Sequence, residues 1–249
     1  MARFIGAIIV ALLVSGLGRP ARADDAQAII DKAVKALGGE EKLSKVKAAT
    51  WKGKGTITFD GNDNRISTQT TVRGIDHYRQ EFEGDFGGNT IKGVAVLAGD
   101  KGWRRFGDDR SALEQEVLAN QKRVAYLTAI PLTVLPLKGQ GFKVEAAGEE
   151  AVDGKPAAGL RVTPPDGKEF RIYFDKESGL PVRLVAKVLG FMGEEYTQET
   201  NFGDYKEMGG IRKATKIRAK RDGERYIDQE ITEFKVLDTV DPKTFAEPQ

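Results

Sequence analysis

Apolar and polar residues alternate with a period of two along most of the chain beyond residue 49, which predicts a succession of β-strands. The predicted strands are 56–59, 66–72, 78–83, 94–98, 103–106, 142–148, 158–164, 169–175, 181–190, 195–202, 214–221 and 225–237. Asp-Gly pairs begin at positions 60, 153, 166 and 222, and this dipeptide between alternating segments is the strongest short-range signal for a β-hairpin. The apolar phase changes between Ile231 and Phe234, so we expect a β-bulge near 232–233.

Two segments follow helical spacing instead. Residues 24–39 place apolar side chains on one face and end at a pair of glycines, and residues 109–127 align Leu113, Val117, Val124 and Leu127. No stretch between the two blocks of strands has the composition of a linker. We therefore predict a mainly β (α+β) fold. It is a single curved antiparallel half-barrel of about eleven strands, with an N-terminal helix and an inserted helical lid, because a sheet this long must curl.

The segment 127–139, "LTAIPLTVLPLKG", is apolar and carries no charge before Lys138. Pro131 and Pro136 argue against a long regular helix or a central strand here. The segment follows the inserted helix and precedes the second block of strands, so we expect it to cross the open face of the half-barrel as part of the lid. Its aliphatic side chains would contact either the core or a bound ligand, and both alternatives stay open.

Two strands are apolar on both faces, at 93–99 and 181–192. A sheet with one solvated face does not need this pattern. Coverage by the helices would account for part of it, and a ligand or a lid on the same face would account for the rest.

Residues 1–23 are predicted to be a signal peptide. Arg3 provides the positive start, the apolar run 4–17 is shorter than the roughly 20 residues of a membrane span, and Ala-Arg-Ala at 21–23 suits signal peptidase. An uncleaved anchor is the alternative. The chain has no cysteine, which excludes disulfides and a lipid anchor on cysteine. We expect a periplasmic protein, exported and soluble, with no transmembrane span after cleavage.

Charge gives little support for a nucleic-acid partner. Cleavage would remove three arginines and no acidic residue, so the formal charge of +2 would fall to about −1. The basic run 212–221 projects Lys216, Arg218 and Lys220 from one face of a strand, and Glu224, Asp228 and Glu230 on the next strand can lie opposite them. We favour a solvated outer face, with an anionic-membrane or nucleic-acid patch as the alternative.

Residues for catalysis and metal binding are scarce. His77 is the only histidine, which excludes His-based triads and two-histidine zinc sites within one chain. There is no nucleophile elbow and no phosphate-binding glycine loop. Asp60, Asn62 and Asn64 begin like a calcium loop, but Arg65 stands where glycine is needed, so we interpret the segment as a polar hairpin turn. We expect no enzyme activity, no catalytic residue, no metal and no cofactor.

Four phrases carry a family resemblance: "AVKALGGEEKLSKVKAATWKGKG", "GEEAVDGKPAAGLRVTP", "RIYFDKESGLPVRL" and "FGDYKEMGGIRKATKI". Together they resemble the outer-membrane lipoprotein-sorting (LolA/LolB-like) superfamily, over about 28–247, and assign 24–249 to a lipid-binding half-barrel domain. The resemblance implies a non-enzymatic carrier that holds a lipid or the acyl chains of a lipoprotein in a concave apolar cavity. An envelope sensor or protein-interaction module without lipid is the alternative.

The resemblance also implies partners among inner- or outer-membrane proteins, and no nucleic acid. No cargo-contacting residue can be transferred from the family, so the cavity lining is predicted from phase and position. The expected lining residues are Trp103, Phe106, Leu132, Val134, Leu135, Phe170, Ile172, Leu184 and Val188.

Overall fold

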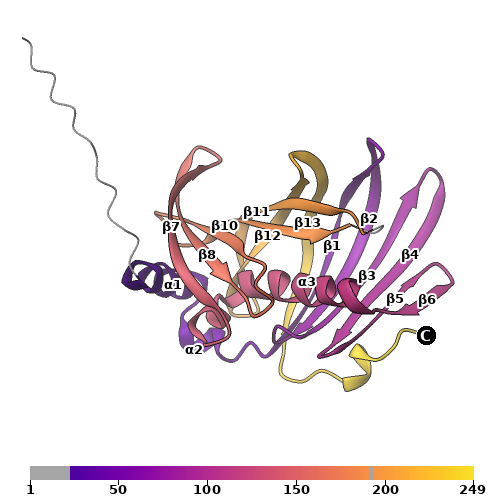
Figure 1. Cartoon of the computed structure of the whole chain (residues 1–249), viewed down its shortest axis with the longest axis horizontal. Helices are drawn as coiled ribbons and strands as arrows, with labels where there is room; N and C mark the ends of the chain where they lie inside the picture. The colour runs from indigo at the N-terminus through magenta and orange to yellow at the C-terminus, as the bar shows by residue number, and fades with distance from the viewer. Residues whose placement is uncertain (1–22, 191–192) are drawn as a thin grey trace, which may run out of the picture.

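The computed structural model describes residues 23–190 and 193–249, so the predicted signal peptide lies outside the described residues except for Ala23. The described part forms one antiparallel, 13-stranded sheet in the order β6-β5-β4-β3-β2-β1-β13-β12-β11-β10-β9-β8-β7. Figure 1 shows the sheet curved and open, with β6 and β7 at its edges. The predicted mainly β half-barrel is confirmed, with 13 strands in the described residues where about eleven were expected.

The elements of the first half are α1 (Ala23–Leu37), α2 (Glu40–Leu43), β1 (Ala48–Phe59), β2 (Asn62–Arg73), β3 (His77–Phe86), β4 (Asn89–Ala98), β5 (Lys101–Phe106), β6 (Asp109–Ala112) and α3 (Gln115–Thr133). Those of the second half are η1 (Leu135–Lys138), β7 (Lys143–Val152), β8 (Lys155–Thr163), β9 (Phe170–Asp175), β10 (Pro181–Leu189), β11 (Glu195–Met208), β12 (Ile211–Arg221), β13 (Glu224–Leu237) and η2 (Pro242–Phe245).

The chain forms two β-meanders that are joined where the first strand pairs with the last. β1 lies between β2 and β13. In the β1–β13 ladder Lys52 pairs with Glu233 and Gly53 pairs with Ile231, which leaves Thr232 as an extra residue. The predicted β-bulge near 232–233 is therefore confirmed, and it explains the change of apolar phase in this strand.

Three of the four Asp-Gly pairs form two-residue hairpin turns. Asp60, Asp153 and Asp222 have φ between 47° and 49°, and the glycine that follows each also has positive φ. This is the backbone that type I′ turns require. Gly167 also has positive φ, but the Asp-Gly pair at 166 lies in the longer connection between β8 and β9.

The inserted helix begins later than predicted. Residues 109–112, expected to start the helix, form the short edge strand β6, and α3 begins at Gln115. The expected apolar face is also partly wrong, because Val117 is 42% exposed while Arg123, Tyr126 and Ile130 are buried. A short polar strand and a helix start carry similar residues, so the composition of 109–114 did not separate them.

The segment 127–139 is more helical than its prolines suggested. Residues 127–133 are the last turns of α3, and 135–138 form η1. Pro131 lies only two residues before the end of α3, where its missing N–H removes a single hydrogen bond. Val134 then adopts a left-handed backbone with φ 61°, which is strained for a β-branched residue. The segment still crosses the sheet without joining it, as expected.

Helix α3 spans the concave face. It contacts β10 on one side and β4 and β5 on the other, although these strands are far apart in the sheet order. One helix can reach both only because the sheet curves around it (Figure 1). The main core lies between the sheet and the helices, and it includes Ile30, Leu37, Ile130 and Leu160.

The two strands that are apolar on both faces each pack against a second, smaller hydrophobic cluster on their outer side. Leu97 joins the main core, while Val94 and Val96 pack with Phe245 of η2. On β10, Val182 and Val185 pack against the cluster of Val152, Ala157 and Tyr173. The chain's own residues therefore account for the second apolar face of these strands.

The basic strand β12 has paired cations on its outer face. Lys216 lies opposite Glu230 and Arg218 opposite Asp228 in the register, as predicted, and the last two form an ion pair of 3.5 Å. The third expected pairing is absent from the register, because Lys220 lies opposite Arg225 and Glu224 opposite Arg221. The two pairs that do form support the solvated outer face. Among the residues that the structure describes, no helix has both the length and the apolar character needed to cross a membrane.

Candidate binding cavity

A cavity of about 190 Å³ lies between α3 and the concave face of the sheet. Its wall on one side comes from α3 and β10, and this side is largely apolar. On the other side β1, β2, β3, β11, β12 and β13 contribute a mixed wall. The lining includes Trp51, Thr70, Gln80, Val124, Leu127, Leu132, Leu184, Ala186, Val188, Gln198, Thr200, Phe202, Tyr205, Lys213, Ala219 and Gln229.

The apolar wall follows from helical and strand periodicity. Val124, Leu127 and Leu132 lie on α3, and Leu184 and Val188 share one face of β10. An engineered apolar cavity of about 150 Å³ is large enough to bind benzene, while sites for drug-sized ligands occupy about 300–1,000 Å³. The volume of this cavity therefore fits part of one acyl chain, and a larger ligand requires α3 to move.

The opposite wall carries neutral polar groups. Gln80 Nε2 donates to Thr70 Oγ1 at 3.4 Å, and Gln229 Nε2 donates to Thr68 Oγ1 at 2.6 Å. The Tyr205 hydroxyl donates to the Pro181 carbonyl oxygen at 2.7 Å. These bonds satisfy much of the polar wall internally, so the cavity is amphipathic.

Lys213 is the one charged side chain among the described residues that line the cavity. It is only 9% exposed. Its Nζ lies 5.2 Å from the centroid of the Trp51 ring, in a cation–π contact. Burial lowers the pKa of Lys213 to about 8, because the apolar surroundings penalise the charged form.

Arg123 fixes α3 to the second half of the sheet. Its guanidinium donates to the carbonyl oxygens of Lys187 (2.5 Å), Lys168 (2.5 Å) and Glu169 (2.9 Å). It also donates to the Tyr126 hydroxyl at 2.5 Å, and that hydroxyl donates to Asp166 at 3.0 Å. The side chain is 2% exposed. This network joins the helix to β10 and to the start of β9.

A second, more open groove lies on the other side of the C-terminal end of α3. It has a volume of about 330 Å³ and is lined by α2, β1, β2, α3 and η1. Leu132 lines both this groove and the cavity, so its side chain is part of the wall between them. Movement of the last turn of α3 would therefore connect the two spaces.

The nine residues predicted to line a cavity occupy five different places. Leu132, Leu184 and Val188 line the cavity, and Leu135 lines the second groove. Val134, Phe170 and Ile172 are buried in the main core. Trp103 packs with the outer cluster near Phe245, and Phe106 is 36% exposed beside Phe82.

The sequence-based lining set omitted the polar side of the cavity. Trp51, Lys213 and the glutamines of β3, β11 and β13 were absent from it. The sequence did contain a signal for Lys213. In a strand, alternate residues face the same side, so Lys213 lies on the same face as Thr215, Ile217 and Ala219 and opposite the outer cations of the same run.

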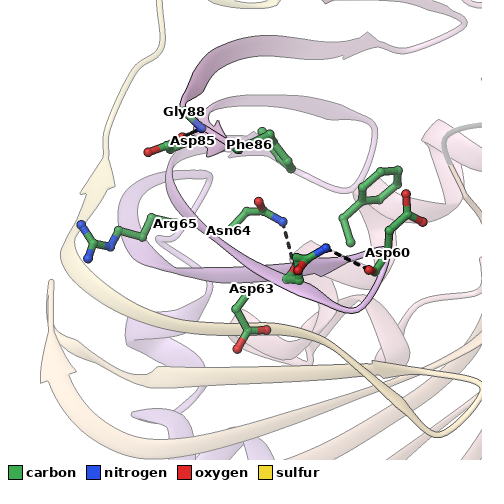
Figure 2. A pocket seen from close by; sticks show the side chains of 10 residues that line it. Asp60, Asp63, Asn64, Arg65, Asp85, Phe86 and Gly88 are labelled. Carbon is green, nitrogen blue, oxygen red and sulfur yellow. Dashed lines mark hydrogen bonds between the residues drawn. The ribbon is translucent and has the colours of Figure 1, made fainter.

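A larger but open depression of about 640 Å³ lies between the tips of the β1–β2 and β3–β4 hairpins. Figure 2 shows its lining, in which the polar residues Asp60, Asp63, Asn64, Arg65 and Asp85 lie with Phe86 and Gly88. The calcium-loop-like residues bond to their own backbone here: Asn62 donates to the Asp60 carbonyl oxygen at 3.1 Å and Asn64 to that of Asn62 at 2.9 Å. This confirms the polar hairpin turn. Within the described ranges, no three acidic or histidine side chains group as metal ligands.

The fold matches solved structures over almost their whole length. A LolA superfamily protein from Nitrosomonas europaea aligns with a TM-score of 0.58 and 12% identity, over 89% of this chain and 97% of that one. The chain has the fold of the LolA superfamily. A domain assigned to outer membrane lipoprotein sorting, from Vibrio parahaemolyticus, shares this LolA-like fold with a TM-score of 0.53 and 8% identity, over 87% and 97%.

A DUF1329 family protein from Desulfovibrio piger also aligns, with a TM-score of 0.54 and 15% identity over 89% of this chain and 97% of that one. No family model and no curated protein matches the chain. The predicted resemblance to the LolA superfamily is confirmed for the fold, while identities this low leave function to be argued from the cavity.

Proposed function

We propose that this protein is a non-enzymatic periplasmic binder or carrier of a lipid or of the acyl group of a lipoprotein. The observation that carries the proposal is the cavity under α3, whose helix and β10 walls are apolar. Each methylene group moved from water into such a space contributes about 0.8 kcal/mol. The LolA-like fold and the expected signal peptide support a role in lipid traffic across the periplasm, with membrane proteins as exchange partners.

The small volume favours a single chain over a diacyl lipid. Arg123 holds the middle of α3 to β9 and β10, whereas the end of the helix packs through aliphatic side chains such as Ile130 and Leu132. Apolar contacts have no fixed geometry, so this end is the part of the lid that we expect to shift when a longer chain enters. Displacement of Leu132 would extend the cavity into the second groove.

One observation favours the alternative of a protein-interaction module. Much of the concave face is filled by the chain's own residues, including Phe170, Ile172 and Val134, which leaves a cavity of only about 190 Å³. A module of this kind would recognise its partner from the surface of α3 or the sheet edges and would need no ligand. Native mass spectrometry of protein purified from an envelope fraction separates the two proposals. Recovery of a protein that is repeatedly free of lipid would contradict the carrier.

A cavity-filling substitution tests the carrier without unfolding the protein. Ala219 is buried and lines the cavity, so in Ala219→Leu the added carbons occupy the space proposed for the acyl chain. We expect lipid retention to fall by on the order of tenfold or more, since about three methylenes of ligand are displaced. The melting temperature should stay within a few degrees, because filling a cavity is neutral or stabilising. Bound lipid is measured by extraction and mass spectrometry.

The matched control is Ala158→Leu on β8, which adds the same atoms at a half-buried position outside the cavity lining. It should retain lipid as the wild type does. If both variants lose lipid equally, the loss comes from general perturbation of the sheet and the cavity is not the binding site.

A further inference from the structure

Lys213 stands out because a buried cation in an apolar space normally has an acidic partner. Among the described residues, its charge has one contact, the face of the Trp51 ring at 5.2 Å. No carboxylate is present in the described lining of the cavity. The side chain is more than nine-tenths buried and points into the space where the ligand would lie.

Charged groups on the neighbouring strands do not neutralise Lys213. Its cross-strand neighbour on β11 is Lys206, an exposed residue that adds positive charge. On β13, Glu233 is bound to Lys52 at 3.1 Å and Asp228 to Arg218 at 3.5 Å. On α3, the residues that line the cavity are all uncharged. Within the part of the chain that the structure describes, the cation therefore faces the cavity without a counter-ion.

We propose that the cavity binds a single-chain amphiphile with an anionic head group, whose negatively charged oxygens pair with the Lys213 ammonium. This proposal rests on the proposed function and specifies its ligand class. A buried ion pair is favourable only when hydrogen bonds satisfy the remaining lone pairs of the anion. Gln80 and Gln198 each use one amide N–H on a neighbouring threonine, Thr70 and Thr200. The second N–H of each amide remains to supply such hydrogen bonds from the lining of the cavity.

The two walls of the cavity suit the two ends of such a ligand. Val124, Leu127, Leu184 and Val188 form an apolar surface for the chain, and the head group would lie on the side of the sheet that carries Lys213. A volume of about 190 Å³ matches part of one chain better than two. The ligand class is therefore a monoanionic oxyacid with one alkyl chain, of which a fatty acid is the simplest example.

The test compares three probes that differ in one feature each. Dodecanoate has the chain and the anion, dodecanol has the chain alone, and acetate has the anion alone. Binding to delipidated protein is measured by titration calorimetry at pH 7 and below micelle-forming concentrations. We expect the wild type to bind dodecanoate at least tenfold more tightly than dodecanol, and acetate not measurably.

Three variants test whether the preference for dodecanoate over dodecanol depends on the charge of Lys213. Lys213→Met should bind dodecanol as the wild type does but lose the preference for dodecanoate, to within about threefold. Lys213→Arg should keep the preference, because it keeps the charge. Lys216→Met removes the same charge from the outer face of the same strand and should also keep it. Unchanged dodecanol binding shows that the cavity is intact in Lys213→Met.

Each other result overturns a defined part of the argument. Equal binding of dodecanoate and dodecanol by the wild type, or a preference that survives in Lys213→Met, overturns the anionic ligand and leaves the lipid carrier standing. Binding of acetate as tight as dodecanoate identifies a simple anion site and overturns the amphiphile. Failure of both twelve-carbon probes to bind overturns the carrier and the ligand class together.

Discussion

Replacing Arg123 with methionine is expected to lower the free energy of unfolding by about 3–5 kcal/mol, which is typical of breaking a buried charged network. The guanidinium is 2% exposed and donates to three backbone carbonyl oxygens, those of Lys168, Glu169 and Lys187. Methionine fills a similar volume but donates nothing, so these carbonyls would lose a buried donor and each loss has a desolvation cost. Urea unfolding followed by circular dichroism measures the change.

The control is Lys122→Met, at the adjacent position of the same helix. Lys122 is exposed and pairs with Asp100 on the surface, and exposed ion pairs contribute about 0–1 kcal/mol. The two variants remove one cation each and keep the helix propensity similar. A loss of stability in Arg123→Met that is no larger than in Lys122→Met would contradict the anchoring role of Arg123.

The contacts of Arg123 explain why the sequence predicted the inserted helix but not the interactions that hold it to the sheet. The insertion of a helix between two blocks of strands was readable from periodicity alone. The acceptors of Arg123 lie 45 to 64 residues further along the chain, and they are backbone carbonyls that carry no signature in the sequence. A buried arginine in a helix is indistinguishable from an exposed one until the opposing surface is known.

The strands that are apolar on both faces show a second limit of prediction from the sequence. The pattern indicated that 93–99 and 181–192 need cover on both faces, which we expected from the helices together with a ligand or a lid. On β4 the outer cover is η2, whose Phe245 lies about 150 residues away in the sequence and packs on Val94 and Val96. Trp103 was predicted to face the cavity, but it packs with this outer cluster.

Local signals were more reliable than long-range ones. The β-bulge at Thr232 and three Asp-Gly hairpins depend on neighbouring residues, and the structure has all of them. The conformation at the end of α3 was harder to predict, because the prolines at 131 and 136 argue against a helix while the burial of Ile130, Leu132 and Leu137 favours one. Burial against the sheet outweighed local propensity there.

Replacing Lys213 with methionine is expected to have the opposite effect to the loss of Arg123 and to stabilise the protein without ligand, by about 3 kcal/mol at pH 7. Burial holds the pKa of Lys213 near 8 against an ordinary value of 10.5, and each unit corresponds to 1.36 kcal/mol. Below pH 8 both folded and unfolded chains carry the proton, so the wild type has the full penalty. Between pH 8 and 10.5 the unfolded chain binds more protons, and wild-type stability therefore rises with pH.

The advantage of Lys213→Met should consequently shrink as the pH rises from 8 to 10.5, whereas at pH 6–7 it should be constant. Buried tyrosines such as Tyr78 and Tyr205, whose pKa values burial raises, titrate above this window in the folded state and alkaline pH weakens both proteins through them. The difference between variant and wild type removes that contribution. Urea unfolding of both proteins at pH 7, 9 and 10.5 measures this difference in the free energy of unfolding.

A difference that does not change with pH, or a variant less stable than the wild type at pH 7, would show that the ammonium is not buried as a charge. A variant that is more stable but has lost the preference for an anionic chain would instead place Lys213 among the residues that give up stability for binding.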